Sequence, residues 1–497
     1  MTGRSNVRSG TTYRRYAGWG LVIALVVSLA TGCTITRGLE NYRAWLEGQP
    51  ILSGIDGPEQ STGSISSGLD KRAIAGASVK EDATSAELDS LARGLESFMA
   101  GKPGFKEAHL TLTLGPDQVT LSGRRGENES MLTAYRTIRD DPGLRSVDMG
   151  RLWRANGITE DVRTTAELAY DTANHATDGM VDASRVLSQL PAKGERPTEA
   201  SWTMGTSQGA SSDLRLWQLE PMSAATVAAA LPALDTAGAS VSVGEPYSLP
   251  GEEKSEWTVT VSDAATALDL HTQLASAGSA AFPDGLVVES RKPLEIPLTM
   301  RGATPATPAE TLMIQRLLVA EPRALEWSAS DGYIVTLNEK LREAAPYLSL
   351  LPEETKLTII HKDREFEYTV SGTTSEVRVL HPRFGAARDA GEIKWLTVSP
   401  GHVEVMLSPL SHSVWTQKTI PALRGAGWDG AWQIHLSGYA DSNVPVDLTF
   451  NSTPTGRATG VDATKGIDDA PKDQRGEAGK AWQQFIAEWD ATASSSR

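Results

Sequence analysis

Cysteine is almost absent from this 497-residue chain, since Cys33 is the only one. A single cysteine excludes an internal disulfide framework, a zinc site built from several cysteines and a redox Cys-x-x-Cys pair. The folded part of the chain must therefore be held together by packing. At this length two or more folded units are expected rather than one large core.

Positive charge is also scarce, with 47 Lys and Arg against 62 Asp and Glu and a formal net charge of −15. Affinity for nucleic acid comes mainly from Lys and Arg neutralising phosphates, so the composition argues against a nucleic-acid partner. An acidic exterior also disfavours broad adsorption on anionic lipid. It leaves room for a local basic patch.

Signals for metal or cofactor chemistry are equally sparse. The eight histidines are scattered, and none stands in an HxH or HxxxH spacing that would place two ligands together. Pairs of acidic residues lie in loop-like sequence, where solvation explains them without a general acid and base. We therefore predict no metal, no cofactor and no enzymatic activity.

One short pattern keeps a catalytic alternative open. Gly205–Gly209 fits the GxSxG signature of a serine hydrolase, in which the nucleophile would be Ser207. That signature needs a helix directly after it, whereas Leu214–Trp217 alternates like a strand and favours a hairpin loop. The alternative is an envelope hydrolase that uses Ser207 with a distant histidine such as His175 or His271.

The N-terminus has the arrangement of an export signal. Four arginines and no acidic residue precede an uncharged run from Tyr16 to Thr36. The run leads through Leu29–Gly32 to the single cysteine, and this resembles the lipobox of bacterial lipoproteins, although Ala30 stands where that family usually has leucine. The resemblance implies that Cys33 carries lipid and becomes the mature N-terminus.

Two other interpretations of this segment remain open. The uncharged run is long enough to cross the ~30 Å core of a bilayer as an uncleaved signal anchor. Arg14-Arg15 also suggests twin-arginine export, but the residues around it match that motif poorly. Both the lipoprotein and the signal-anchor interpretation place the bulk of the chain outside the cytoplasm, at the cell membrane.

Beyond residue 85 the hydrophobic pattern predicts an α+β fold of tandem α-β-β-α-β(-β) modules. In the first module, Leu88–Phe98 has helical spacing, His109–Ser122 alternates like a hairpin, Met131–Ile138 is helical again and Leu144–Met149 resembles a strand. The same order recurs three more times. The resulting division is signal segment 1–36, juxtamembrane helix and flexible spacer 37–85, module one 86–155, connecting segment 156–213, modules two to four 214–300, 301–373 and 374–451, and a flexible tail with an amphipathic helix 452–497.

The first module resembles the BON domain, a small α+β module of bacterial envelope proteins. The residues that carry the resemblance are Pro103-Gly104-Phe105, the strand ending Val119–Gly123 and the turn and strand Pro142–Val147. Asp117-Gln118 stands where the family usually has a glycine. The resemblance implies attachment to envelope or membrane surfaces, including phospholipid, and names no catalytic residue. A related module builds rings in secretion machinery, so self-association into a ring or coat is a further alternative.

Aromatic residues supply the remaining candidates for binding. Trp327 and Trp395 fall at matching places in two successive hairpins, where they either pack or form an exposed ligand platform. A helical spacing of Trp482, Phe485 and Trp489 predicts an amphipathic helix that packs back on a module or docks to a partner protein. Together these features predict a membrane-tethered binding or scaffolding protein of the bacterial cell envelope.

Overall fold

The computed structural model describes residues 37–495 except for several short stretches. Those left out are 63–70, 102, 104, 106, 156–159, 192–195, 208, 245–255, 292–295, 338–343, 363–366, 391–392, 408–417, 429, 441–443, 470–471 and 473–474. The predicted signal segment 1–36 lies outside the described residues. Within them the protein is α+β, with alternating strands and helices, as the sequence predicted. It divides into two units, residues 1–255 and 256–497.

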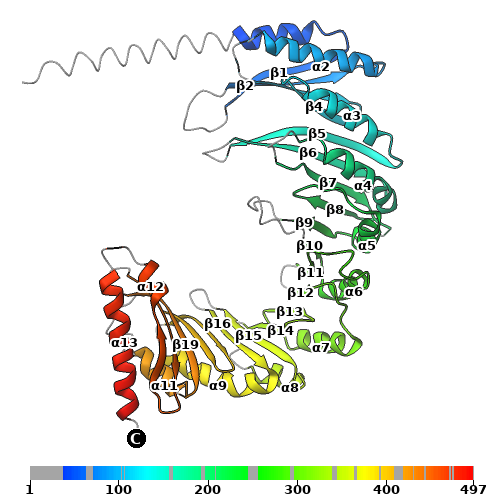
Figure 1. Ribbon diagram of the computed structural model, residues 1–497. Coiled ribbons are helices and arrows are strands. Elements are labelled where there is room, and N and C mark those ends of the chain that lie inside the picture. Colours follow the sequence, from blue (N-terminus) through cyan, green and yellow to red (C-terminus); the bar gives the residue numbers. More distant parts are fainter. Residues whose placement is uncertain are drawn as a thin grey trace, which may run out of the picture. The chain divides into compact units, whose positions relative to one another are not determined.

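Unit 1 begins with a helix over residues 37–47, which is followed by a regular series of strand pairs and helices (Figure 1). Its further elements are β1 (Leu52–Thr62), β2 (Lys71–Val79), α2 (Ser85–Ala100), β3 (Glu107–Leu114), β4 (Asp117–Ser122), α3 (Glu127–Arg139), β5 (Leu144–Ala155), β6 (Glu160–Tyr170), α4 (Ala173–Leu187), β7 (Glu199–Gly205), β8 (Ser211–Leu216), α5 (Ala224–Leu234) and β9 (Ser240–Val243).

The strands of unit 1 pair in chain order. β1–β2, β3–β4, β5–β6 and β7–β8 are antiparallel. β2–β3, β4–β5, β6–β7 and β8–β9 are parallel, and one helix connects the two strands of each such pair. The repeating element is therefore a hairpin followed by a crossover helix, and successive repeats extend a single sheet.

Unit 2 follows the same rule. It contains β10 (Trp257–Val261), α6 (Ala264–Ala275), β11 (Leu286–Ser290), β12 (Leu298–Arg301), α7 (Pro308–Val319), β13 (Ala324–Ser328), β14 (Gly332–Leu337), α8 (Ala345–Leu350), β15 (Lys356–Lys362), β16 (Glu367–Thr373), α9 (Thr374–Ala390), β17 (Ile393–Ser399), β18 (His402–Leu407), α11 (Ile420–Gly425), β19 (Trp432–Ala440), β20 (Val444–Ser452), β21 (Ala458–Asp462), α12 (Thr464–Asp469) and α13 (Arg475–Ser495). Parallel and antiparallel pairs alternate from β10 to β20, and β21 closes the series antiparallel to β20.

Alternation along the strands puts the core on one face of each sheet. In β8, for example, exposed and buried residues alternate, with Leu214 and Leu216 buried and Asp213 and Arg215 exposed. The helices pack on the buried face, where α2, α3, α4 and α5 each contact strands of unit 1 (Figure 1). The opposite face, which we call the open face, carries mostly polar side chains.

Local sequence explains where helices begin and where a hairpin turns. Thr84 and Thr307 each accept from the backbone three residues on, and Glu87 and Glu310 bind back, which forms two capping boxes. Gly332 opens β14 with φ +75°, and a Cβ built there would lie 2.3 Å from the carbonyl oxygen of Lys356. Only glycine fits that position without displacing the backbone.

The structure corrects the expected spacer, connector and tail. Strands β1 and β2 lie within the expected spacer, and β6, α4, β7 and the start of β8 lie within the expected connecting segment. Their inward residues are mostly small, such as Ala73, Ala75 and Ala77 in β2, so their hydrophobic signal is weak. In the expected flexible tail, β21 pairs with β20, and α12 and α13 contact β20.

Candidate functional site

The two tryptophans expected at matching places lie on opposite faces of their sheet. Trp327 in β13 is 2% exposed and contacts the ring of His271 edge to face, with centroids 5.8 Å apart. Trp395 in β17 is half-buried on the open face. Leu396 and Val398 are fully buried, so alternation along β17 places Trp395 on the face opposite to them. Trp327 therefore packs in the core.

The predicted amphipathic helix is α13, and it packs back on unit 2. Phe485 and Trp489 are 1% and 0% exposed, and the Trp489 ring meets Phe450 of β20 with centroids 5.1 Å apart. The guanidinium of Arg424 lies 4.3 Å from the Trp489 ring centroid. Trp482 is half-buried on the same helix. Two of the three aromatic side chains proposed for partner docking are thus engaged within the chain.

Ser207 lies in the turn that joins two antiparallel strands, β7 and β8, and not in a strand-to-helix turn. Its hydroxyl donates to Oδ2 of Asp235, and its backbone N–H donates to Oδ1, both at 2.8 Å. His175 is held by Asp171, with Nδ1 2.7 Å from Oδ1. His271, in the other unit, is buried against the carbonyl oxygen of Gly302. This geometry lacks the elbow and the serine–histidine contact of a hydrolase among the described residues.

Two further expectations concern the N-terminal region. Cys33, the predicted lipidation site, lies outside the described residues. In the part of the chain that the structure describes, no helix has the length and apolar character needed to cross a membrane.

The most concentrated polar cluster of unit 1 forms around Glu107, the first residue of β3, which is 6% exposed. Arg124, just past β4, donates from Nε to Oε1 of Glu107 at 2.8 Å. Arg72 of β2 lies directly beside Glu107 in register, with its Nε 3.5 Å from Oε2. His109 places Nε2 3.7 Å from the same oxygen. One buried carboxylate is thus surrounded by three basic side chains, and we call this group the Glu107 cluster.

These contacts decide the charge of the carboxylate. Burial alone would raise the pKa of Glu107, but its contacts with His109 and Arg124 outweigh burial and hold the pKa below its ordinary value. Glu107 therefore stays ionised at neutral pH. It is poorly suited to act as a general base, because its carboxylate oxygens already pair with guanidinium groups.

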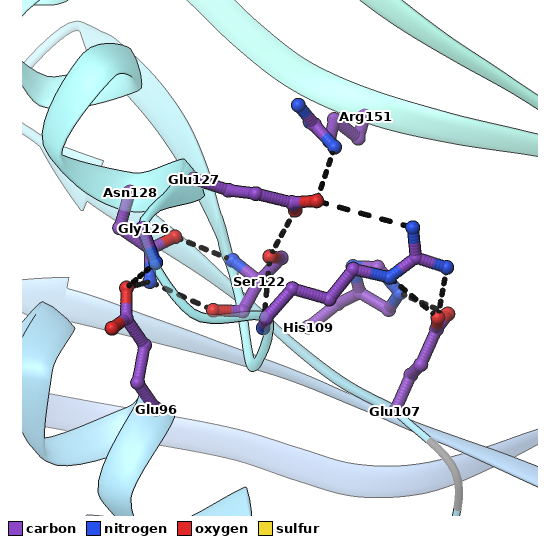
Figure 2. Close-up of polar contacts among 9 residues, drawn as sticks. Glu96, Glu107, His109, Ser122, Gly126, Glu127, Asn128 and Arg151 are labelled. Carbon is purple, nitrogen blue, oxygen red and sulfur yellow. Dashed lines mark hydrogen bonds and ion pairs between the residues drawn. The ribbon is translucent and has the colours of Figure 1, made fainter. Parts of the chain in front are cut away.

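A second carboxylate, Glu127, joins this cluster to α3 (Figure 2). It accepts from the Ser122 hydroxyl at 2.7 Å and pairs with Nη1 of Arg151 at 2.7 Å and, more loosely, with Nη1 of Arg124 at 3.9 Å. Glu127 is also the first residue of α3, where a negative charge complements the helix dipole. The cluster therefore fixes the start of α3 against the end of β4 and against Arg151 within β5.

The turn into α3 is tied down from the other side as well. Asn128 exchanges two hydrogen bonds with the backbone of Ser122, both at 2.8 Å. Glu96 of α2 accepts from Gly126 N–H and from Asn128 Nδ2, each at 3.2 Å (Figure 2). The result is a rigid support for Arg124, which lies within this turn.

The same arrangement occurs a second time, at the first residue of β7. Glu199 is 5% exposed and pairs through Oε2 with Nη1 of Arg163 at 3.0 Å. It also accepts from Nε of Arg215 at 2.9 Å. The guanidinium of Arg215 stacks 4.0 Å over the ring of Trp217. We call this group the Glu199 cluster.

The two clusters lie at the same end of the sheet. Antiparallel and parallel pairings alternate, so β3 and β7 run in the same direction and start at the same end. Four arginines on this end, Arg72, Arg124, Arg163 and Arg215, surround two glutamates, and we call these four the arginine edge. Among the described contacts, the Glu199 cluster has two guanidinium groups on one carboxylate, and the Glu107 cluster together with Glu127 and Arg151 has three on two.

The outer arginine of each cluster remains accessible. The side chains of Arg124 and Arg215 are 37% and 45% exposed, although each binds a nearly buried glutamate. A guanidinium has five N–H donors in a fixed plane, so such an arginine can bind a further carboxylate or phosphate. Within the described ranges no group of three or more metal-ligating side chains comes together.

Sequence reasoning did not find these clusters. Glu107 and Arg124 are 17 residues apart, and Glu199 and Arg215 are 16 apart, so no short motif contains both partners. The available signal was positional: each glutamate opens the first strand of a hairpin, and each arginine lies at or just past the end of the second strand. That signal becomes visible only once the hairpins are placed.

Comparison of the chain with protein-family models, with curated proteins and with solved structures found no match.

Proposed function

We propose that this chain is a membrane-tethered, non-catalytic binding or scaffolding protein of the bacterial cell envelope, built from BON-like α-β-β-α-β modules behind a lipid-anchored N-terminus. The observation that carries the proposal is the arginine edge. It gives the chain, whose net charge is −15, one defined place for an anionic group of the envelope surface, such as a phosphate or carboxylate.

The arginine edge is suited to binding because it is already ordered. Glu107 and Glu199 hold the guanidinium planes, and Trp217 supports Arg215, so little side-chain entropy is lost when a ligand arrives. The repeats add a second advantage. Two equivalent clusters on one sheet allow a repetitive polymer or a lipid surface to be contacted at two points, which strengthens attachment without new chemistry.

The N-terminal helix supports a short tether. Tyr42 and Leu46 are fully buried, and Tyr42 donates to the carbonyl oxygen of His109 at 3.2 Å while its ring stacks on Phe98. The helix over 37–47 is thus part of the folded body. If Cys33 carries lipid, the chain from it to residue 37 spans about 14 Å at full extension. Unit 1 would then lie close to the membrane surface.

The described edge strand does not favour the ring or coat alternative. β1 pairs with β2, but its register breaks twice, between Ser53 and Ile55 and between Asp56 and Glu59. Pro58 falls within the second break and has no N–H to donate. Such irregular edges are how natural sheets avoid adding another chain. We therefore place tethered binding ahead of self-association.

The test is binding to vesicles rich in phosphatidylglycerol and to a native cell-wall fraction, measured by cosedimentation at several salt concentrations. The double variant Arg124→Gln with Arg215→Gln should bind clearly less, and the salt dependence of wild-type binding should flatten in it. The matched control is Arg185→Gln, because Arg185 is 59% exposed on α4, away from the open face. Equal binding by all three proteins would contradict the proposal.

Anchoring is tested separately. The intact mass of protein from native membranes should correspond to a chain that starts at Cys33 and carries acyl groups, and Cys33→Ser should abolish that mass. A full-length mass unchanged by the substitution would replace the lipid anchor with a signal anchor.

A further inference from the structure

Two histidines that are far apart in the sequence meet in unit 2. His361 lies near the end of β15, and His381 lies in α9. Their Nε2 atoms are 2.9 Å apart, and their ring centroids are 5.1 Å apart with the ring planes at 37°. A separation of 20 residues fits no spacing motif, so the sequence alone did not indicate this pair.

The position of His361 is unusual for a polar ring. Leu357 and Ile359 precede it on the same inward face of β15 and are 1% and 0% exposed, and His361 itself is 8% exposed. His381 is half-buried on the helix that covers this strand. Burial of an imidazole lowers the stability of the fold unless its polar nitrogen has a hydrogen-bond partner. Here a second imidazole is such a partner.

We propose that His361 and His381 form a binding site for a borderline divalent transition-metal ion, such as Zn²⁺ or Cu²⁺. Both rings present the same nitrogen, Nε2, and neutral imidazole nitrogens are preferred ligands of these ions. Two imidazoles on a tetrahedral ion, with metal–nitrogen distances of about 2.0–2.1 Å, have nitrogens about 3.3 Å apart. The present separation of 2.9 Å reaches that value by small rotations of the rings.

Binding of the ion replaces the hydrogen bond between the two rings by two metal–nitrogen bonds and needs no redox step. In the ion-free pair one Nε2–H donates to the Nε2 lone pair of the other ring. When the ion binds, that proton moves to Nδ1 of the donor ring through solvent, and both Nε2 lone pairs bind the metal. No third His, Cys, Asp or Glu joins the pair within the described residues. The ion would fasten α9 to the end of β15.

This inference is independent of the proposed function and is tested with the untagged full chain. Cu²⁺ alone is added, and electron paramagnetic resonance is used to count the nitrogens on the bound ion, while Zn²⁺ affinity is measured by competition with a chromogenic chelator. Mg²⁺, which prefers oxygen ligands, is the control ion. The wild-type chain should bind one ion with two imidazole nitrogens and should not respond to Mg²⁺.

Variants assign the site. His381→Gln should weaken Zn²⁺ binding at least about tenfold, because loss of even an outer partner of a metal ligand costs about 10- to 100-fold. His402→Gln is the matched control: His402 lies in the same unit but contacts Gln433, with Nδ1 3.1 Å from Oε1, and its loss should change nothing. Unchanged binding in His381→Gln would show that ions bind elsewhere and would overturn the proposal.

A measurement on the wild-type chain covers the case in which His381→Gln fails to fold. Zn²⁺ should protect His381 from modification by diethyl pyrocarbonate, read by peptide mass spectrometry, and should leave the modification of His402 unchanged. Equal modification of His381 with and without Zn²⁺ would refute the site.

Discussion

Replacement of Glu107 by glutamine should destabilise unit 1 more than its conservative shape suggests. The substitution keeps the size of the side chain but removes the negative charge that lies among Arg72, His109 and Arg124. Loss of one partner from a buried ion pair costs about 3–5 kcal/mol. Arg124 is 37% exposed and can turn to water, so we expect a loss near or just below the lower end of that range, about 2–3 kcal/mol.

The assay is urea unfolding with hydrogen exchange of β3–β5 peptides, which assigns the transition to unit 1. With an m value of about 2 kcal/mol/M, the predicted loss lowers the midpoint by about 1 M urea. Asp182→Asn is the control within unit 1, because Asp182 pairs with Arg185 on α4 where both side chains are more than half exposed. Such a pair contributes less than about 1 kcal/mol. Equal midpoint shifts in the two variants would refute the reasoning.

The effect should also depend on pH in a defined direction. The pKa of Glu107 is lowered in the folded protein, because its contacts with His109 and Arg124 outweigh the effect of burial. A lowered folded pKa contributes stability that is present above the unfolded pKa, about 4.3, and is lost as pH falls through the folded value. The difference between wild type and Glu107→Gln should therefore be full at pH 7 and shrink below about pH 4.

Three further substitutions test other parts of the structure. Trp489→Ala should lower the free energy of unfolding by about 3–5 kcal/mol, because this buried ring holds α13 on β20. It should also remove the hydrogen-exchange protection of residues 475–495, and retained protection would contradict the packing. Thr307→Ala should lower the stability of unit 2 by about 1 kcal/mol in thermal unfolding, because it removes a capping box; no change would show that the cap is dispensable. Ser207→Ala should lower the free energy of unfolding by less than about 1 kcal/mol, because the hydroxyl that it removes lies in an exposed turn and bonds only Asp235 in the described contacts. It should leave any hydrolysis of p-nitrophenyl acetate unaltered, and loss of such activity would restore the hydrolase alternative.

The sequence predicts the α+β class because its strong periodic segments are long and apolar. Leu88, Leu91 and Leu95 are all buried in α2, and Leu110 and Leu112 are fully buried in β3. It does not predict β2 or α4, whose cores consist largely of alanine. Alanine buries too little apolar area to produce a clear pattern, yet it fits where helix and sheet approach closely.

The candidate site was beyond the reach of sequence reasoning for a different reason. Glu107 and Glu199 gain their charge environment from strand neighbours that are distant in the chain, and His361 meets His381 only through the packing of α9 on β15. Trp395 lies on the open face because its neighbours Leu396 and Val398 point into the core, so similar places in two hairpins do not give Trp327 and Trp395 the same surroundings. Register, not composition, decides each of these placements.

The central claim, that the arginine edge of unit 1 binds an anionic group of the envelope, is tested most directly by photo-crosslinking in cells of the native host. A photoreactive residue is placed at Thr203, which is exposed on the open face of β7, and in a matched strain at Asp178, which is exposed on α4. We predict a discrete crosslinked adduct from position 203, whose yield falls in the Arg124→Gln, Arg215→Gln double variant. The same adduct should not form from position 178. The same adducts from both positions, or none from position 203, would contradict it.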